Sequence, residues 1–297
     1  MTGPTRVISR RTLLRDLGHG AFALTVIGLA GCARGPARTV DPLTPTFDPL
    51  TRTFGPARTV DPTSTFDPLT YVGNLDEIEA FWCESDLPSP PASQGPSGSA
   101  APNSMPWARI GDVRASGYVL VRGGEATVVD TGPWCVPDVI EGALMAVGLD
   151  WSAVGSVIVT HKHPDHWVGL SSALERAADA DVFAGAADIP HIASPRPIVA
   201  VGAGDRVMDL AIIPTPGHTP GHIAVHDEAA GVLVVGDAIG NHPEQGLLLL
   251  GTSEDVPQTQ ASVSILAGLS FDTLLPGHGD PIIGGAWEEL TEYLAGT

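Results

Sequence analysis

Apolar and polar positions in the second half of the chain predict a layered α/β domain. Residues 117–122 and 125–130 flank a Gly-Gly turn and have the pattern of a β-hairpin. Residues 137–147 have the pattern of a helix, and the apolar run at 156–160 is typical of a buried strand. A second helix is predicted over 165–178, because Pro and Asp are both favourable at its start.

The N-terminal segment has the pattern of an export signal. Residues 9–15 are basic and include Arg10 and Arg11, and the apolar run that follows is shorter than the roughly 20 residues of a membrane span. This order is typical of a twin-arginine signal, and the Leu-Ala-Gly-Cys sequence ending at Cys32 resembles a bacterial lipoprotein cleavage box. We expect residues 1–31 to be a signal peptide and Cys32 to carry lipid, which would anchor the protein to the outer face of a bacterial membrane. An amphipathic helix with an incidental Cys is the alternative.

A repeat and a linker follow the signal. The sequence Gly-Pro-Ala-Arg-Thr-Val-Asp-Pro occurs at 35–42 and again at 55–62. Two copies are too few to build a solenoid core. The segment is rich in Pro, Thr, Ser and Gly, so we interpret residues 32–105 as a tether with a short helix over 71–83. The catalytic domain is then predicted over 106–297.

Composition narrows the class of partner. The chain has 297 residues, with 15 Lys and Arg against 34 Asp and Glu, and a formal net charge of −19. Phosphates need basic side chains to neutralise them, so nucleic acid is excluded as a partner and a small molecule is expected. The sequence gives no indication of oligomeric state. Cys32, Cys83 and Cys135 cannot form a disulfide framework, and pairing of the last two is left open.

A histidine-rich run after the strand at 156–160 has the spacing of a metal site. His161 and His163 lie two apart in extended chain, so their side chains leave on the same side. Asp165 and His166 follow at the predicted helix start and can face a second ion. Imidazole nitrogen and carboxylate oxygen suit Zn²⁺, and also Fe or Mn. Core packing is a poor explanation, because burying several His without partners is costly.

Three later motifs repeat this logic. His218 lies in a Thr-Pro-Gly-His turn, Asp237 follows the apolar run at 231–236, and His278 lies in a Pro-Gly-His-Gly turn. Each motif follows a predicted strand. Ligands at one end of several strands of an α/β domain converge on one cleft.

In this order, and together with the Val-Val-Asp-Thr-Gly sequence around Asp130, these motifs resemble the metallo-β-lactamase-fold superfamily over residues 106–297. The resemblance implies an α/β fold, a four-layer αββα sandwich with a two-metal site in its edge cleft. It implies that Asp237 bridges both ions and that Asp130 orients a ligand. The other ligands implied are His161, His163 and His218 for one ion, and Asp165, His166 and His278 for the other.

The resemblance implies a binuclear metal-dependent hydrolase. Two divalent ions, for which we expect Zn²⁺ with Fe or Mn as alternatives, would present a metal-bridging hydroxide to an ester, thioester, lactone or amide bond. Asp165 would accept a proton in addition to ligating. Asp237 stands where the commonest zinc β-lactamases carry Cys, which implies a glyoxalase II-like or lactonase-like branch. A mononuclear iron sulfur dioxygenase of the same fold and a lipid-anchored, metal-bound binding module without turnover remain alternatives.

Other residues near these motifs are assigned lesser roles. Trp134 and Trp167 either line the cleft or pack in the core. Specificity is expected to lie in loops such as 133–137, 186–204 and 239–255. Five histidines without a matching motif are interpreted as surface or turn residues: His19, His191, His222, His226 and His242.

Overall fold

The computed structural model describes residues 6–8, 106–112, 114–135 and 137–297. Apart from strand β1 (Arg6–Ile8), the predicted signal peptide, lipidated Cys32, repeat, tether and helix over 71–83 lie outside these residues. All described residues belong to one unit of the chain by their contacts. No helix among them is long and apolar enough to cross a membrane.

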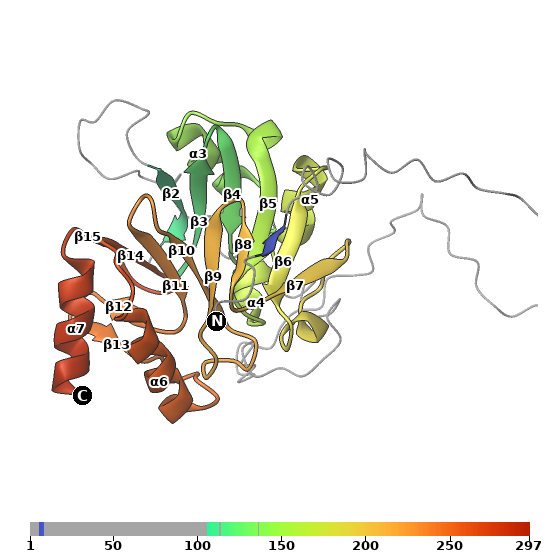
Figure 1. Ribbon diagram of the computed structural model, residues 1–297. Helices are drawn as coiled ribbons and strands as arrows, with labels where there is room; N and C mark the ends of the chain where they lie inside the picture. The colour runs from blue at the N-terminus through green and yellow to red at the C-terminus, as the bar shows by residue number, and fades with distance from the viewer. Residues whose placement is uncertain (1–5, 9–105, 113, 136) are drawn as a thin grey trace, which may run out of the picture. The chain divides into compact units, whose positions relative to one another are not determined.

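In the described part of the chain, the first sheet has six strands in the order β2-β3-β4-β5-β6-β7 (Figure 1). β2, β3 and β4 pair antiparallel, and β4 to β7 pair parallel. The β3–β4 pairing confirms the hairpin predicted around the Gly-Gly turn. The strands are β2 (Trp107–Asp112), β3 (Ala115–Arg122), β4 (Glu125–Val129), β5 (Val154–Val159), β6 (Asp181–Gly185) and β7 (Ile198–Val201).

The second sheet has the order β1-β8-β9-β10-β11-β14-β15 among the described strands. β8 to β11 pair antiparallel, whereas β11 and β14 run parallel. A separate hairpin, β12 (Gly240–His242) and β13 (Gly246–Leu248), follows β11. The other strands are β8 (Asp205–Val207), β9 (Leu210–Pro214), β10 (Ile223–Asp227), β11 (Val232–Gly236), β14 (Thr273–Pro276) and β15 (Ile282–Ile283).

Strand alternation divides the described apolar core into three layers. Tyr118 and Leu120 of β3 face the second sheet, whereas Val119 faces the opposite side, where α3 and α5 pack. In the same way Val234 of β11 faces the first sheet and Leu233 faces α6 and α7. Side chains two apart in a strand share a face, so each strand contributes to two layers of core. This arrangement confirms the predicted αββα sandwich.

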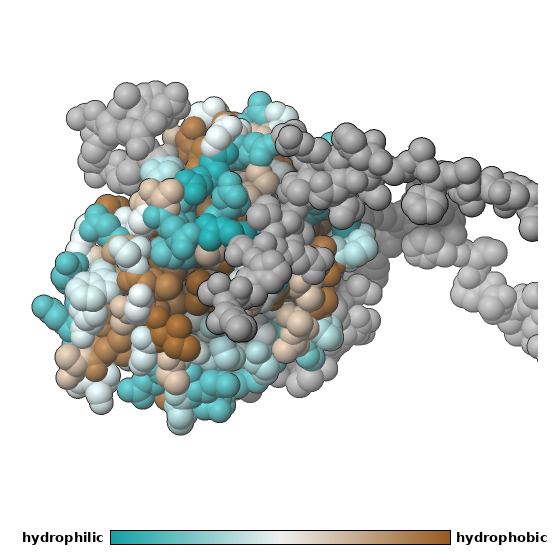
Figure 2. All heavy atoms as spheres, viewed as in Figure 1, coloured by the Kyte–Doolittle hydropathy of each residue, from teal (hydrophilic) through white to brown (hydrophobic). Residues whose placement is uncertain are grey.

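The helices cover the two outer faces of the sandwich. Figure 2 shows hydrophobic residues reaching the surface in the region of α6 and α7, where Ile265 and Trp287 are 59% and 39% exposed. The helix predicted over 137–147 is confirmed as α3. The helices are α3 (Asp138–Ala146), α4 (Pro164–Trp167), α5 (Leu170–Arg176), α6 (Val256–Leu266) and α7 (Ala286–Gly296).

The single helix predicted over 165–178 is wrong. The chain forms two helices, α4 and α5, with a break at Val168 and Gly169. Gly169 lies so close to the loop after β4 that a Cβ atom there would be 2.8 Å from the carbonyl oxygen of Thr131. Its N–H donates to the carbonyl of Gly132. This tertiary contact explains the break, which helix propensity could not predict.

Candidate metal centre

Loops at the carboxyl ends of neighbouring strands bring the predicted residues to one edge of the two sheets. β4 and β5 run parallel, so Asp130 and the His161–His166 loop leave the first sheet at the same edge. β11 and β14 also run parallel, which places Asp237 and His278 at one edge of the second sheet. The N–H of Ser116 donates to the carbonyl of Gly277 at 2.8 Å and joins the sheets there. All the predicted site residues come together.

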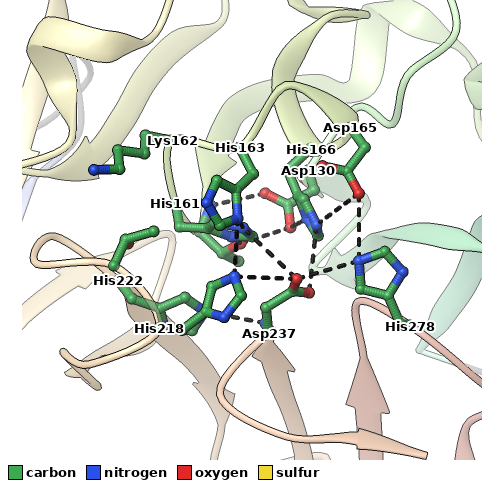
Figure 3. Close-up of polar contacts among 12 residues, drawn as sticks. Asp130, His161, Lys162, His163, Asp165, His166, His218, His222, Asp237 and His278 are labelled. Atoms are coloured by element: carbon green, nitrogen blue, oxygen red, sulfur yellow. Dashed lines mark hydrogen bonds and ion pairs between the residues drawn. The ribbon is translucent and has the colours of Figure 1, made fainter. Parts of the chain in front are cut away.

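Three ring nitrogens and one carboxylate form the first donor group (Figure 3). Nδ1 of His163 lies 3.0 Å from Nε2 of His161 and 2.9 Å from Nε2 of His218. Oδ2 of Asp237 lies 3.3 Å from Nε2 of His218 and 3.7 Å from Nε2 of His161. Donors bound at about 2.0–2.1 Å to one tetrahedral ion lie about 3.3 Å from one another. The four donor atoms therefore have the separations of a tetrahedral metal site.

The second donor group lies on the other side of Asp237. Nε2 of His278 is 3.3 Å from Oδ2 of Asp165 and 3.2 Å from Oδ2 of Asp237. Nε2 of His166 is 3.6 Å from Oδ2 of Asp165 and 3.3 Å from Oδ1 of Asp237. Oδ2 of Asp237 therefore faces histidines of both groups, whereas Oδ1 faces His166 of the second group (Figure 3). Asp237 belongs to the first donor group, and its distances to His166 and His278 link it to the second group as well.

A hydrogen bond at Nδ1 of His161, the ring nitrogen directed away from the other donor atoms, determines the tautomer of this ring. The hydroxyl of Thr160 donates to Oδ2 of Asp130 at 2.7 Å. The hydroxyl proton of Thr160 is used in that hydrogen bond. The hydroxyl oxygen of Thr160 therefore accepts a hydrogen bond from Nδ1–H of His161 at 3.0 Å. Nε2 of His161 therefore carries a lone pair when the ring is neutral, which is the form that binds metal.

Two further rings are oriented in the same way. Nδ1 of His166 donates to Oδ2 of Asp130 at 2.9 Å, and Nδ1 of His278 donates to the carbonyl of Arg114. Asp130 also accepts from the N–H of Thr160 at 2.7 Å, so its carboxylate holds one ring of each donor group, directly or through Thr160. Carboxylate and carbonyl partners of this kind fix the tautomer of metal-binding histidines. Nε2 of each ring is left for a ligand.

Buried polar atoms without partners test whether a metal fits. Within the described residues, Oδ1 of Asp165, Nε2 of His166 and Oδ1 of Asp237 are buried and form no hydrogen bond. Such atoms cost free energy unless another group satisfies them. These three atoms belong to the donor groups, and the fourth such atom among the described residues is Nε1 of Trp151. Nitrogen and oxygen donors in this combination suit divalent ions such as Zn²⁺, Fe²⁺ and Mn²⁺.

Burial keeps the histidines of the first group neutral. It lowers the pKa of His218 to about 4 and the pKa of His161 well below its ordinary value, and it lowers the pKa of His163 as well. Neighbouring histidines add to this effect at each ring, because a second imidazolium nearby would be unfavourable. The first group is therefore ready to bind a cation without losing protons.

The second group has the opposite electrostatics. Burial disfavours the charged rings of His166 and His278, but the carboxylates of Asp237 and Asp165 outweigh it. The pKa of His278 rises to about 10, and that of His166 rises well above its ordinary value. Burial also opposes ionisation of Asp165 and Asp237, yet these rings lower the pKa of both carboxyls. The metal-free group is a set of paired charges.

His222 is expected at the surface or in a turn, and it does follow the Pro/Gly turn, but its side chain is not at the surface. Its ring is buried, with its centre 5.2 Å from that of His161. Its Nε2 accepts from the N–H of Asp237 at 3.0 Å, which leaves Nδ1–H to donate to the hydroxyl of Thr215 at 2.7 Å. The location of His222 in the same Pro/Gly turn as His218 is the sequence signal that pointed to this role.

The remaining histidines divide between the surface and the interior. His226 is also buried, contrary to prediction, and its Nε2 donates to the carbonyl of Ser270 at 3.0 Å. His191 and His242 are exposed, as predicted. His19 lies outside the described residues.

Asp188 is a buried carboxylate that the sequence analysis missed. Its Oδ2 accepts from the N–H of Lys162 at 3.0 Å and from the hydroxyl of Thr219, and its Oδ1 accepts from the N–H of Gly221 at 2.8 Å. It thereby joins the loop of His161 and His163 to the loop of His218. No motif marks it, because its partners lie 26 or more residues away in the sequence.

A glycine allows Asp237 to reach the second group. A Cβ atom at Gly277 would lie 2.1 Å from Oδ1 of Asp237 and 2.8 Å from a ring carbon of His166. Any other residue at this position would displace the carboxylate or the ring. The Pro-Gly-His-Gly motif therefore needs its first glycine for space beside the donor atoms.

Two tryptophans and one cysteine near the site are not among its donor residues. Trp134 and Trp167 are both buried in the core between the first sheet and its helices, and Nε1 of Trp167 donates to the carbonyl of Lys162. This settles the two alternatives in favour of core packing. Cys135 is disulfide-bonded, and Cys83 lies outside the described residues.

Comparison with known proteins agrees with the fold. The sequence model of the metallo-beta-lactamase superfamily matches residues 110–278. A hydroxyacylglutathione hydrolase of Cereibacter sphaeroides is 35% identical over 162 residues, which cover 52% of this chain and 58% of that protein. Thioesterase pkgB of Emericella nidulans is 27% identical over 168 residues, which cover 56% of this chain and 46% of that protein.

The matched region spans 58% to 60% of the length of the first three curated relatives. Among solved structures, the metallo-beta-lactamase SMB-1 superposes with a TM-score of 0.50 at 19% identity, covering 64% of this chain and 91% of that chain. At this identity the likeness concerns the fold alone. Since the superfamily model matches more than half of its residues, the chain belongs to the metallo-beta-lactamase superfamily of metallo-hydrolases.

Proposed function

We propose that this protein is a binuclear metal-dependent hydrolase that cleaves an ester, thioester, lactone or amide bond of a small molecule. The observation that carries the proposal is the position of Asp237, whose carboxylate oxygens lie 3.2 to 3.3 Å from histidine nitrogens of both donor groups. His161, His163 and His218 would hold one ion, Asp165, His166 and His278 would hold the other, and Asp237 would contact both. Two bound divalent ions would supply Lewis acidity that activates water and polarises the bond under attack.

The chain's own groups position the reactants and accept the proton. Oδ1 of Asp165 is buried without a hydrogen-bond partner, and the lowered pKa of this carboxyl keeps it ionised. It can therefore orient a water molecule and accept its proton. Asp130 has a different role, because both of its carboxylate oxygens accept hydrogen bonds within the protein. It holds the ring of His166, and through Thr160 the ring of His161, at fixed angles.

Metal analysis combined with a substrate panel tests this proposal. Purified protein should contain about two divalent ions per chain, for which we expect Zn²⁺, and should hydrolyse at least one class among esters, thioesters, lactones and β-lactams. A single iron with oxygen consumption would replace the proposal with a sulfur dioxygenase. Stoichiometric metal without turnover of any compound would replace it with a binding module.

We also propose that the protein is exported and lipid-anchored. The order of Arg10 and Arg11, a short apolar run and Cys32 supports this proposal. These residues lie outside the part of the chain that the structure describes.

A further inference from the structure

A cavity of about 320 Å³ lies beside the candidate metal centre. His278, a member of the second donor group, forms part of its wall, so the cavity adjoins the site. Apolar residues and glycines of the β12–β13 hairpin and its flanks form most of the rest, namely Gly240, Pro243, Leu248, Leu250 and Gly279. Its volume is at the lower end of the range for small-molecule sites, about 300–1,000 Å³.

Four consecutive leucines at the hairpin separate this cavity from the core. Leu247 and Leu249 pack against the core below α6 and α7. Leu248 and Leu250 alternate with them, line the cavity and are only partly buried. Leaving leucine side chains partly in water forgoes about 25 cal/mol for each Å² of apolar surface. An apolar ligand in the cavity would recover this free energy.

Hydrogen bonds attach the hairpin to the loop of His278. The N–H of Asn241 donates to the carbonyl of His278 at 3.0 Å, and its side-chain amide donates to the carbonyl of Asp280 at 2.8 Å. Gly279 lies against the same strand, since a Cβ atom there would overlap the carbonyl of Asn241. The apolar wall is therefore held in a fixed position relative to a donor residue.

In the described part of the chain, the basic side chains nearest the donor loops already have carboxylate partners. Each of them forms an ion pair, at 2.7 to 3.2 Å. In Figure 3 Lys162 points away from the donor atoms. The pairs are Arg109 with Asp280, Arg114 with Asp112, and Lys162 with Glu254.

We infer that the substrate is an uncharged ester, thioester or lactone whose apolar acyl chain lies against Leu248 and Leu250. The inference rests on the proposed hydrolase function and narrows its substrate class. It separates this protein from a hydrolase of glutathione thioesters, because glutathione carries carboxylates that need cationic partners. The acyl chain enters the cavity beside His278, with the bond to be cleaved toward Asp237 and Asp165.

A series of p-nitrophenyl esters from acetate to octanoate tests the chain-length dependence in the metal-loaded enzyme. Each methylene buried against the leucines should raise kcat/KM by up to about fourfold, which corresponds to about 0.8 kcal/mol. The ester of hexanoate should be hydrolysed at least tenfold faster than the matched mono-ester of adipate, which carries a terminal carboxylate.

Variants assign this preference to the cavity. Leu248→Trp fills it and should lower the ratio of octanoate to acetate turnover at least tenfold, and Leu248→Ala should reduce the gain per methylene. Ile283→Trp and Ile283→Ala make the same changes at a side chain 53% exposed outside the cavity, and should leave the ratio unchanged.

Binding of 1-octanol gives a readout that does not depend on catalysis. It should raise the Tm of the wild type and of Ile283→Trp, but not that of Leu248→Trp, because a ligand stabilises only a protein that binds it. If the wild-type enzyme hydrolyses no ester, thioester, lactone or β-lactam yet octanol binds at the leucines, the hydrolase function fails and the apolar site stands. If esters are hydrolysed with no chain-length preference, or if Leu248→Trp leaves that preference intact, the inference is overturned while the hydrolase function stands.

Discussion

The backbone N–H of Asp237 donates a hydrogen bond to Nε2 of His222 at 3.0 Å. This contact holds the residue that faces both donor groups, although His222 itself belongs to neither. His222→Ala would leave the N–H of Asp237 buried without an acceptor and open a space beside His161. We expect metal affinity to fall by about 10- to 100-fold, as for other residues that orient metal ligands.

His222→Gln is the matched control, because its amide oxygen can accept the same hydrogen bond. It should recover most of the affinity that His222→Ala loses in titrations monitored by a competing chelator. Equal, wild-type affinity for both variants would show that the Asp237 contact has no role in metal binding.

Asp188 gives a second prediction. In Asp188→Asn an N–H₂ donor replaces one carboxylate oxygen, and it must face the N–H of Gly221 or the donors from Lys162 and Thr219. Two buried donors facing each other should lower the free energy of unfolding by about 1–3 kcal/mol, measured in urea. Metal affinity should fall as well, because the two ligand loops are no longer joined. Asp150→Asn is the control, since Asn caps the exposed turn at Ser152 about as well as Asp does.

The residues that the sequence analysis missed have hydrogen-bond partners far away in the sequence, whereas the predicted residues lie in short motifs. The donor residues occur in short motifs directly after predicted strands, and the sandwich and the seven candidate ligands could be predicted because these motifs resemble those of the metallo-β-lactamase-fold superfamily. Whether the seven bind two ions stays a prediction. Asp188 and His222 act through hydrogen bonds to other loops, and the break before α5 results from the contact of Gly169 with Thr131. No local pattern contains these contacts.

The two donor groups should differ in the pH dependence of metal binding. In the metal-free protein His278, with a pKa of about 10, is protonated at neutral pH, and so is His166. An ion entering the second group must displace these protons, so its affinity should decrease as pH falls from about 9 to 6, by about tenfold per pH unit for each proton released. The first group is already neutral, and its affinity should change little until the pH approaches the value of about 4 for His218.

Calorimetric titrations in two buffers with different ionisation enthalpies would measure the protons released per ion. The ion that binds to the second donor group should release more protons than the ion that binds to the first donor group. Equal proton release for both ions would contradict the assignment of the charged histidines to the second group.

Export gives a prediction for the N-terminal segment. Replacing Arg10 and Arg11 together by Lys should retain the protein in the cytoplasm, because a twin-arginine signal depends on that pair. Cys32→Ala should prevent lipid attachment and so release the protein from the membrane fraction. Cell fractionation with labelled fatty acid measures both effects, and normal export of the double Lys variant would contradict a twin-arginine route.

Loss of the Asp237 carboxylate should reduce metal content and turnover more than the other substitutions do. Asp237→Ala removes a negative charge between two cation sites and, among the described residues, leaves Nε2 of His166 and Nε2 of His278 with the carboxylate of Asp165. Repulsion between two close ions is then uncompensated, so metal content should fall from about two ions per chain toward one and kcat should fall at least about 100-fold. Glu292→Ala removes an exposed carboxylate on α7 and should keep both ions and normal turnover. Metal stoichiometry and hydrolysis rate measured on the same preparations decide the matter, because two ions with near-normal turnover in Asp237→Ala would show that this carboxylate does not join the two sites.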